Sequence, residues 1–113
     1  MQRDKEAYLW DVLSSIDLIQ QFVGGRSLAD YSRGPMLRSA VEREIIGEAL
    51  AQLLRQYPSV GSSISQSSEI IAFRNRLIHG YSFVADAVVW STIENDLSVL
   101  RAEVATLIAR NDT

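Results

Sequence analysis

Apolar residues recur at three- and four-residue spacing along most of the chain, which is the spacing of one face of a helix. The first run consists of Tyr8, Leu9, Val12, Leu13, Ile16, Ile19 and Val23. It predicts an amphipathic helix from about Asp4 to Phe22, which Gly24 and Gly25 should end.

A second apolar pattern begins after Gly34 and Pro35, a pair that favours a helix start because proline suits the first turn. Its apolar positions are Val41, Ile45, Ile46, Ala49, Leu50, Leu53, Leu54 and Tyr57. Pro58 stops the pattern, which therefore predicts one long helix. The wide apolar arc favours burial on more than one side, as in the centre of a bundle or at a subunit interface. Gly47 weakens a helix interior, so we expect another helix to approach closely there.

Two further helices follow a segment with six serines at positions 59–68, which predicts a connecting loop. A short helix should run from Glu69 to Ile78 and break at Gly80. Asp86 can cap a last helix. The stripe of that helix is the longest in the chain and comprises Val89, Trp90, Ile93, Leu97, Leu100, Val104, Leu107 and Ile108. Trp10 and Trp90 are expected to anchor the core or an interface.

Together these elements predict the fold class. No β-type alternation persists, and the sequence contains no internal repeat. A chain of 113 residues is long enough for one apolar core and too short for two ordinary domains. We therefore expect residues 1–113 to form a single all-α domain, a four-helix up-down bundle with short connections.

Composition excludes several kinds of chemistry. The chain has no cysteine and one histidine, which excludes disulfides, thiolate zinc sites and histidine metal cages, so we expect no metal and no cofactor. Acidic residues interrupt the first twenty positions, and no later run is long enough to span a bilayer, so we expect a cytoplasmic protein without membrane contact. A net charge of -3 argues against a broad face for duplex DNA.

Residues 74–81 read Arg-Asn-Arg-Leu-Ile-His-Gly-Tyr and contain the only histidine. Histidine can take and give a proton near neutral pH, and arginine can grip a phosphate with two parallel hydrogen bonds. The segment therefore indicates work on a phosphodiester. The alternative is that His79 and Gly80 only cap the end of a helix, where an imidazole and a glycine are both favoured.

Helical spacing leaves the assembly of such a site open. Asn75 and His79 are four residues apart and share a helix face, whereas Arg74 and His79 are five apart and are not stacked. If Arg74 and His79 act on one phosphate, the helix bends near Gly80, the arginine side chain swings round, or a second subunit completes the site.

The pattern Arg-x4-His-x-Tyr, with Asn after the Arg and Gly after the His, resembles the catalytic signature of the HEPN ribonuclease toxins. Within that superfamily it is most similar to the HepT-like toxins, whose partner is a minimal nucleotidyltransferase antitoxin. The resemblance also includes residues 46–50, Ile-Gly-Glu-Ala-Leu, and the later Asp86 and Val89-Trp90, so it covers nearly the whole chain. It implies a homodimer whose two motifs face one another across a cleft.

The resemblance also implies an activity, a metal-independent endoribonuclease that uses the ribose 2′-hydroxyl of single-stranded RNA as nucleophile. Arg74 would hold the scissile phosphate and His79 would act as general base or acid. Asn75 and Tyr81 would orient the site. The antitoxin would transfer AMP to the hydroxyl of Tyr81 and so block the site.

Two candidate residues have equally simple surface interpretations. Glu48 is either a hydrogen-bond partner of Arg74 or His79, or a solvated carboxylate. Arg76 either contacts RNA or faces solvent. For the whole chain, the alternative to a nuclease is a non-catalytic helical module that binds a nucleotide or docks onto a nucleotidyltransferase.

Overall fold

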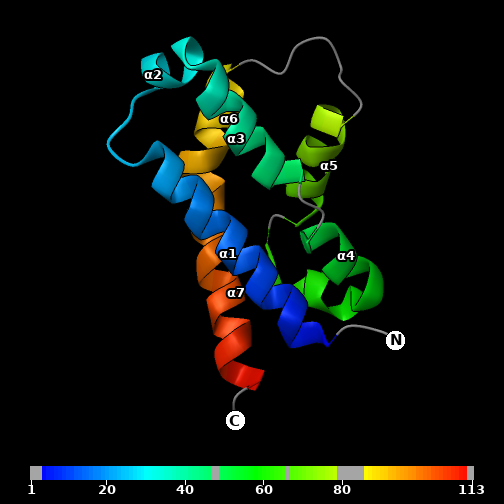
Figure 1. The fold of residues 1–113 in the computed structure, drawn as a ribbon. Helices are drawn as coiled ribbons and strands as arrows, with labels where there is room; N and C mark the ends of the chain where they lie inside the picture. Colours follow the sequence, from blue (N-terminus) through cyan, green and yellow to red (C-terminus); the bar gives the residue numbers. More distant parts are fainter. Residues whose placement is uncertain (1–3, 47–48, 66, 79–85, 112–113) are drawn as a thin grey trace.

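The chain folds into packed helices in the computed structural model, which describes residues 4–46, 49–65, 67–78 and 86–111. Within these ranges helices follow one another with short turns and no strand occurs, so the predicted all-α class is confirmed (Figure 1). None of the described helices is long and apolar enough to cross a membrane.

The first helix forms as the sequence predicts. Helix α1, Lys5–Val23, begins after Asp4, whose Oδ1 accepts a hydrogen bond of 3.3 Å from the amide of Glu6. It ends at Gly24, and Gly25 takes a positive φ of 73° that a residue with a side chain would adopt only with strain. Its buried face consists of Tyr8, Leu9, Val12, Leu13, Ile16 and Ile19.

A short helix that the apolar pattern did not predict follows, α2, Leu28–Arg33. It begins with a capping box, because the amide of Asp30 donates to Ser27 Oγ at 3.2 Å and the amide of Ser27 donates to Asp30 Oδ2 at 2.9 Å. The hydrogen bond from the Ser27 amide is the main reason that the pKa of Asp30 lies below its ordinary value. The helix carries Tyr31, which is fully buried, and burial raises the pKa of its hydroxyl.

The prediction of one long second helix is wrong. The structure has two helices in this part of the chain, which are α3, Pro35–Ile46, and α4, Ala49–Gln56. They do not share an axis in Figure 1, and both contact α1. Two short helices can follow the surface of α1 in different directions, which one straight helix cannot do. Gly47, which separates their sequences, is a poor helix former, although residues 47–48 lie outside the described part of the chain.

The serine-rich segment is more ordered than the predicted loop. A 3-10 helix, η1, Pro58–Ser63, follows α4, and α5, Ser67–Ile78, begins two residues earlier than expected. Val60 and Ile64 are buried and tie this connection to the core. The connection therefore holds the end of α4 close to the start of α5.

The last predicted helix is confirmed as one run of helical backbone. It comprises α6, Asp86–Ser91, a π-helical turn η2, Thr92–Asp96, and α7, Leu97–Asn111. Its stripe is buried at Val89, Trp90, Ile93, Leu97, Leu100, Val104 and Ile108, while Leu107 is partly buried. The Trp90 ring packs against Tyr31 with centroids 5.7 Å apart, as expected of a core anchor.

Helix α1 is the centre of the fold, since it contacts α3, α4 and α7 (Figure 1). Asp17 on α1 accepts two hydrogen bonds from the guanidinium of Arg101 on α7, at 2.6 and 3.3 Å. This ion pair raises the pKa of Arg101. Trp10, by contrast, is 49% exposed and does not anchor the core of this chain, so its role at an interface stays a prediction.

Candidate functional site

An open groove lies between α4 and α5, with a volume of about 580 Å³. It is lined by Ala51, Leu54 and Arg55 of α4 and by Ser67, Ser68, Ile71, Ala72, Arg74 and Asn75 of α5. Two residues of the candidate motif therefore face a hollow large enough for part of a nucleotide chain.

Arg74 is the principal side chain of this groove. It is only 8% exposed, and it is the one charged residue buried in the described part of the chain. Its Nη1 donates a hydrogen bond of 3.1 Å to Asn75 Oδ1. This hydrogen bond and the burial of the side chain hold the guanidinium in place. Such a fixed cation is suited to meeting a phosphate, because little conformational entropy is lost on binding.

The other polar residues of the groove were not predicted as site residues. Arg55 is exposed near the end of α4, and Ser67 and Ser68 stand at the start of α5. None of the described residues that line the groove is acidic. A polar residue on the open side of an amphipathic helix carries no sign that another helix lies beside it, so the sequence pattern could not identify Arg55.

The remaining candidates do not all fall within the described residues. Arg76 is exposed on α5 and does not line the groove. Glu48, His79 and Tyr81 lie outside the described residues. Their contacts with Arg74 therefore stay a prediction.

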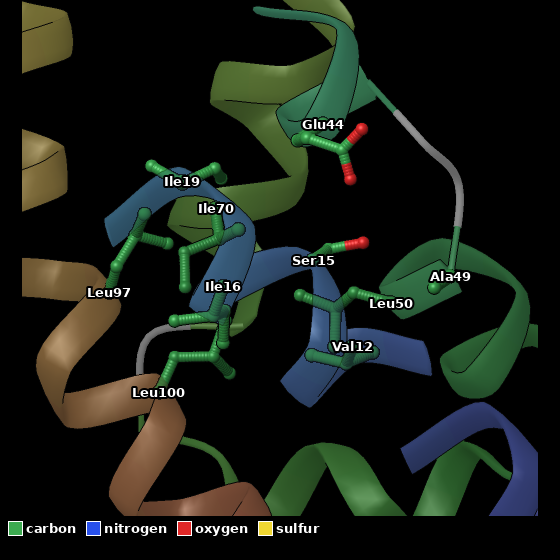
Figure 2. Close-up of a pocket in the computed structure, with 10 residues that line it drawn as sticks. All are labelled: Val12, Ser15, Ile16, Ile19, Glu44, Ala49, Leu50, Ile70, Leu97 and Leu100. Carbon is green, nitrogen blue, oxygen red and sulfur yellow. The ribbon is translucent and has the colours of Figure 1, made fainter. Parts of the chain in front are cut away.

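A second hollow, between α1, α3, α4, α5 and α7, is much smaller, at about 50 Å³. Figure 2 shows the Glu44 carboxylate and the Ser15 hydroxyl pointing into the same space, while the other lining side chains are apolar. Such a space suits one or two waters and is too small for a nucleotide. The groove between α4 and α5 therefore remains the candidate site.

The described residues contain no cluster of three or more metal-ligating side chains. The polar side chains that line the groove carry guanidinium, amide and hydroxyl groups. These groups bind and polarise phosphate oxygens.

Comparison with known proteins relates this chain to one family. The model of a family described as "Ribonuclease HepT-like" matches residues 12–107. A "Putative RNase" of Caldanaerobacter subterraneus is 30% identical over 91% of this chain and 93% of its own length. A "Probable ribonuclease HepT" of Thermococcus cleftensis is 30% identical over 91% of this chain and 94% of its own length.

A third relative, a "Putative RNase" of Methanocaldococcus jannaschii, is 29% identical over 91% of this chain and 95% of its own length. No solved structure matches significantly. The family description and the names of these relatives support ribonuclease activity at the level of the family.

Proposed function

Because the chain belongs to the HepT-like ribonuclease family, we propose that it is a metal-independent endoribonuclease that cleaves single-stranded RNA. One observation carries the proposal: Arg74, the first residue of the Arg-x4-His-x-Tyr segment, is buried in the wall of an open groove and hydrogen-bonded to Asn75. A cation fixed beside an open groove can stabilise the negative charge that develops on a phosphodiester as it is cleaved.

The proposed reaction uses the substrate's own nucleophile. The ribose 2′-oxygen attacks the adjacent phosphorus, the bond from phosphorus to the 5′-oxygen breaks, and a 2′,3′-cyclic phosphate and a 5′-hydroxyl are formed. One base takes the 2′-hydroxyl proton and one acid gives a proton to the leaving 5′-oxygen. His79 fills one of these two parts, and Arg74 stabilises the additional negative charge that develops on the phosphate.

A homodimer is part of the proposal. Arg74 and His79 are five residues apart, a spacing that does not stack two side chains on one helix face. In a two-fold dimer with both motifs near the axis, His79 of the partner subunit can supply the second proton transfer. Tyr81 and Glu48 complete the orientation of the site in this arrangement.

We also propose that the chain is the toxin of a toxin-antitoxin pair, neutralised by transfer of AMP to the Tyr81 hydroxyl. Each AMP adds a phosphate that can pair with the Arg74 guanidinium and repel an RNA backbone. Intact-mass measurement after co-expression with a minimal nucleotidyltransferase should show an AMP-sized gain that is lost in Tyr81→Phe. A gain that persists in Tyr81→Phe would contradict this assignment.

The nuclease proposal is tested by incubating the purified protein with labelled RNA in the presence of EDTA. Wild type should cut the RNA, whereas His79→Ala should leave it intact. If the wild-type protein and His79→Ala both leave the RNA intact but still bind it, the chain is a nucleotide-binding or docking module and the nuclease proposal fails.

A further inference from the structure

The groove carries a second cation that the proposed reaction does not use. Arg55 of α4 and Arg74 of α5 line the groove from different helices, and no described lining residue is acidic. The chain as a whole has a net charge of -3, which on average repels a polyanion. The two arginines therefore make the groove locally positive, and this local charge attracts an RNA backbone.

The two arginines lie at separate points along the groove. Gly61 of η1 borders both helices, since a Cβ placed there would be 3.7 Å from Leu54 and 3.9 Å from Ser67 Oγ. The backbone of Arg55 directly follows that of Leu54, so this arginine starts from the part of the groove near the beginning of α5. Arg74 is seven residues beyond Ser67, which is about 10 Å along the helix axis. A stacked single strand carries one phosphate per 3.4 Å or so of its axis, so the groove can span about three phosphates.

The surface between the arginines suits the rest of a nucleotide. Leu54 and Ile71 are half-buried and present apolar side chains to the groove, while Ala72 is too small to obstruct it. Sugars and bases pack on apolar surface. The Ser68 hydroxyl takes no part in this, because it donates to the Glu69 carboxylate at 3.2 Å.

We propose that the α4–α5 groove binds a length of single-stranded RNA, with Arg55 contacting a flanking phosphate about two or three positions from the scissile one. This inference rests on the proposed function, which assigns the scissile phosphate to Arg74. Arg55 thus binds the chain of the substrate and takes no part in the proton transfers.

Binding of non-cleavable RNA tests the inference apart from catalysis. The probes are a 2′-O-methyl RNA of eight nucleotides and a 2′-O-methyl dinucleoside monophosphate, which has only one phosphate. Each is titrated against wild type, Arg55→Ala and Arg55→Lys. The matched control is Arg26→Ala, which removes an exposed arginine from the connection between α1 and α2, outside the groove.

The expected result depends on the length of the probe. Arg55→Ala should bind the eight-nucleotide probe about fivefold more weakly than wild type and Arg26→Ala. The slope of log affinity against log salt concentration should also fall by about 0.7, the loss expected for one phosphate contact on a single strand. Affinity for the dinucleoside monophosphate should be unchanged, and Arg55→Lys should recover most of the loss.

Three results would overturn the inference: an unchanged affinity of Arg55→Ala for the longer probe, an equal loss for both probes, or an equal loss in Arg26→Ala. An equal loss for both probes would mean that Arg55 shapes the Arg74 site itself. Failure of the wild type to cut ordinary RNA would refute the nuclease proposal and leave the length-dependent binding result standing, so the two failures are distinguishable.

Discussion

Arg74 is a buried side chain of the fold and also the residue that we propose holds the scissile phosphate. Its motif position suggested a phosphate contact, but its burial and the hydrogen bond to Asn75 could come only from the fold. The sequence shows the arginine and its spacing from His79. It could not predict which helix would form the opposite wall, because Arg55 is an ordinary exposed arginine in the pattern.

We expect Arg74→Lys to lower RNA cleavage by about 100-fold, because an ammonium keeps the charge but loses the planar pair of donors. The matched control is Arg43→Lys, an exposed arginine of α3 that does not line the groove. It should cut RNA nearly as fast as wild type. Thermal unfolding followed by circular dichroism should show that both variants are folded. Equal losses in the two variants would contradict a special role for Arg74.

At the scale of elements, apolar periodicity predicted the helices that bury a continuous stripe. The run from α6 to α7 illustrates this, since nearly every residue of its predicted stripe is buried. Periodicity failed for α2, which is too short to show a repeat and is marked instead by its Ser27 and Asp30 capping box. Periodicity also predicted one helix in place of α3 and α4. Apolar positions continue on both sides of Gly47, and this pattern does not reveal a change in the direction of the helix axis.

The capping box gives a stability prediction. Ser27→Ala should lower the free energy of unfolding by about 1 kcal/mol, because the amide of Asp30 loses its acceptor. Helix α2 carries Tyr31, which packs on Trp90, so the effect should reach global unfolding in urea. Ser98→Ala, at an exposed position within α7, should leave the urea midpoint unchanged. A similar shift of the urea midpoint in both variants would show that the Ser27 cap makes no specific contribution to stability.

The same box predicts a dependence on pH. The pKa of Asp30 in the folded protein lies below its ordinary value of 3.8, so its carboxylate stabilises the fold above that pH. This contribution is lost as the pH falls through the lowered value. Wild type should therefore melt at a higher temperature than Asp30→Asn at about pH 6, and the difference should shrink well below pH 3.8. A difference of the same size at both pH values would contradict the assignment.

At the scale of the whole molecule, an acidic protein is proposed to bind RNA through one local basic groove. The sequence indicated the all-α fold and the motif whose first two residues, Arg74 and Asn75, line this groove. It could not indicate the groove itself, because the groove exists only where α4 and α5 are brought together through η1.

The proposed composite site makes an assembly prediction. Sedimentation at micromolar concentration should show a dimer, because one protomer offers a single histidine for two proton transfers. Mixing His79→Ala with wild type should then reduce the activity of the wild-type chains as mixed dimers form. A strict monomer that cuts RNA at full rate would contradict the composite site.

Cleavage through the substrate's own 2′-hydroxyl is the central claim, and one substitution in the RNA tests it most directly. An RNA strand with a mapped cleavage position is compared with the same strand carrying a single 2′-deoxyribose on the 5′ side of that bond, both in EDTA. We predict that wild type cuts the all-ribose strand to a 2′,3′-cyclic phosphate end and leaves the substituted bond intact. Cleavage of the substituted bond at a comparable rate would contradict the account.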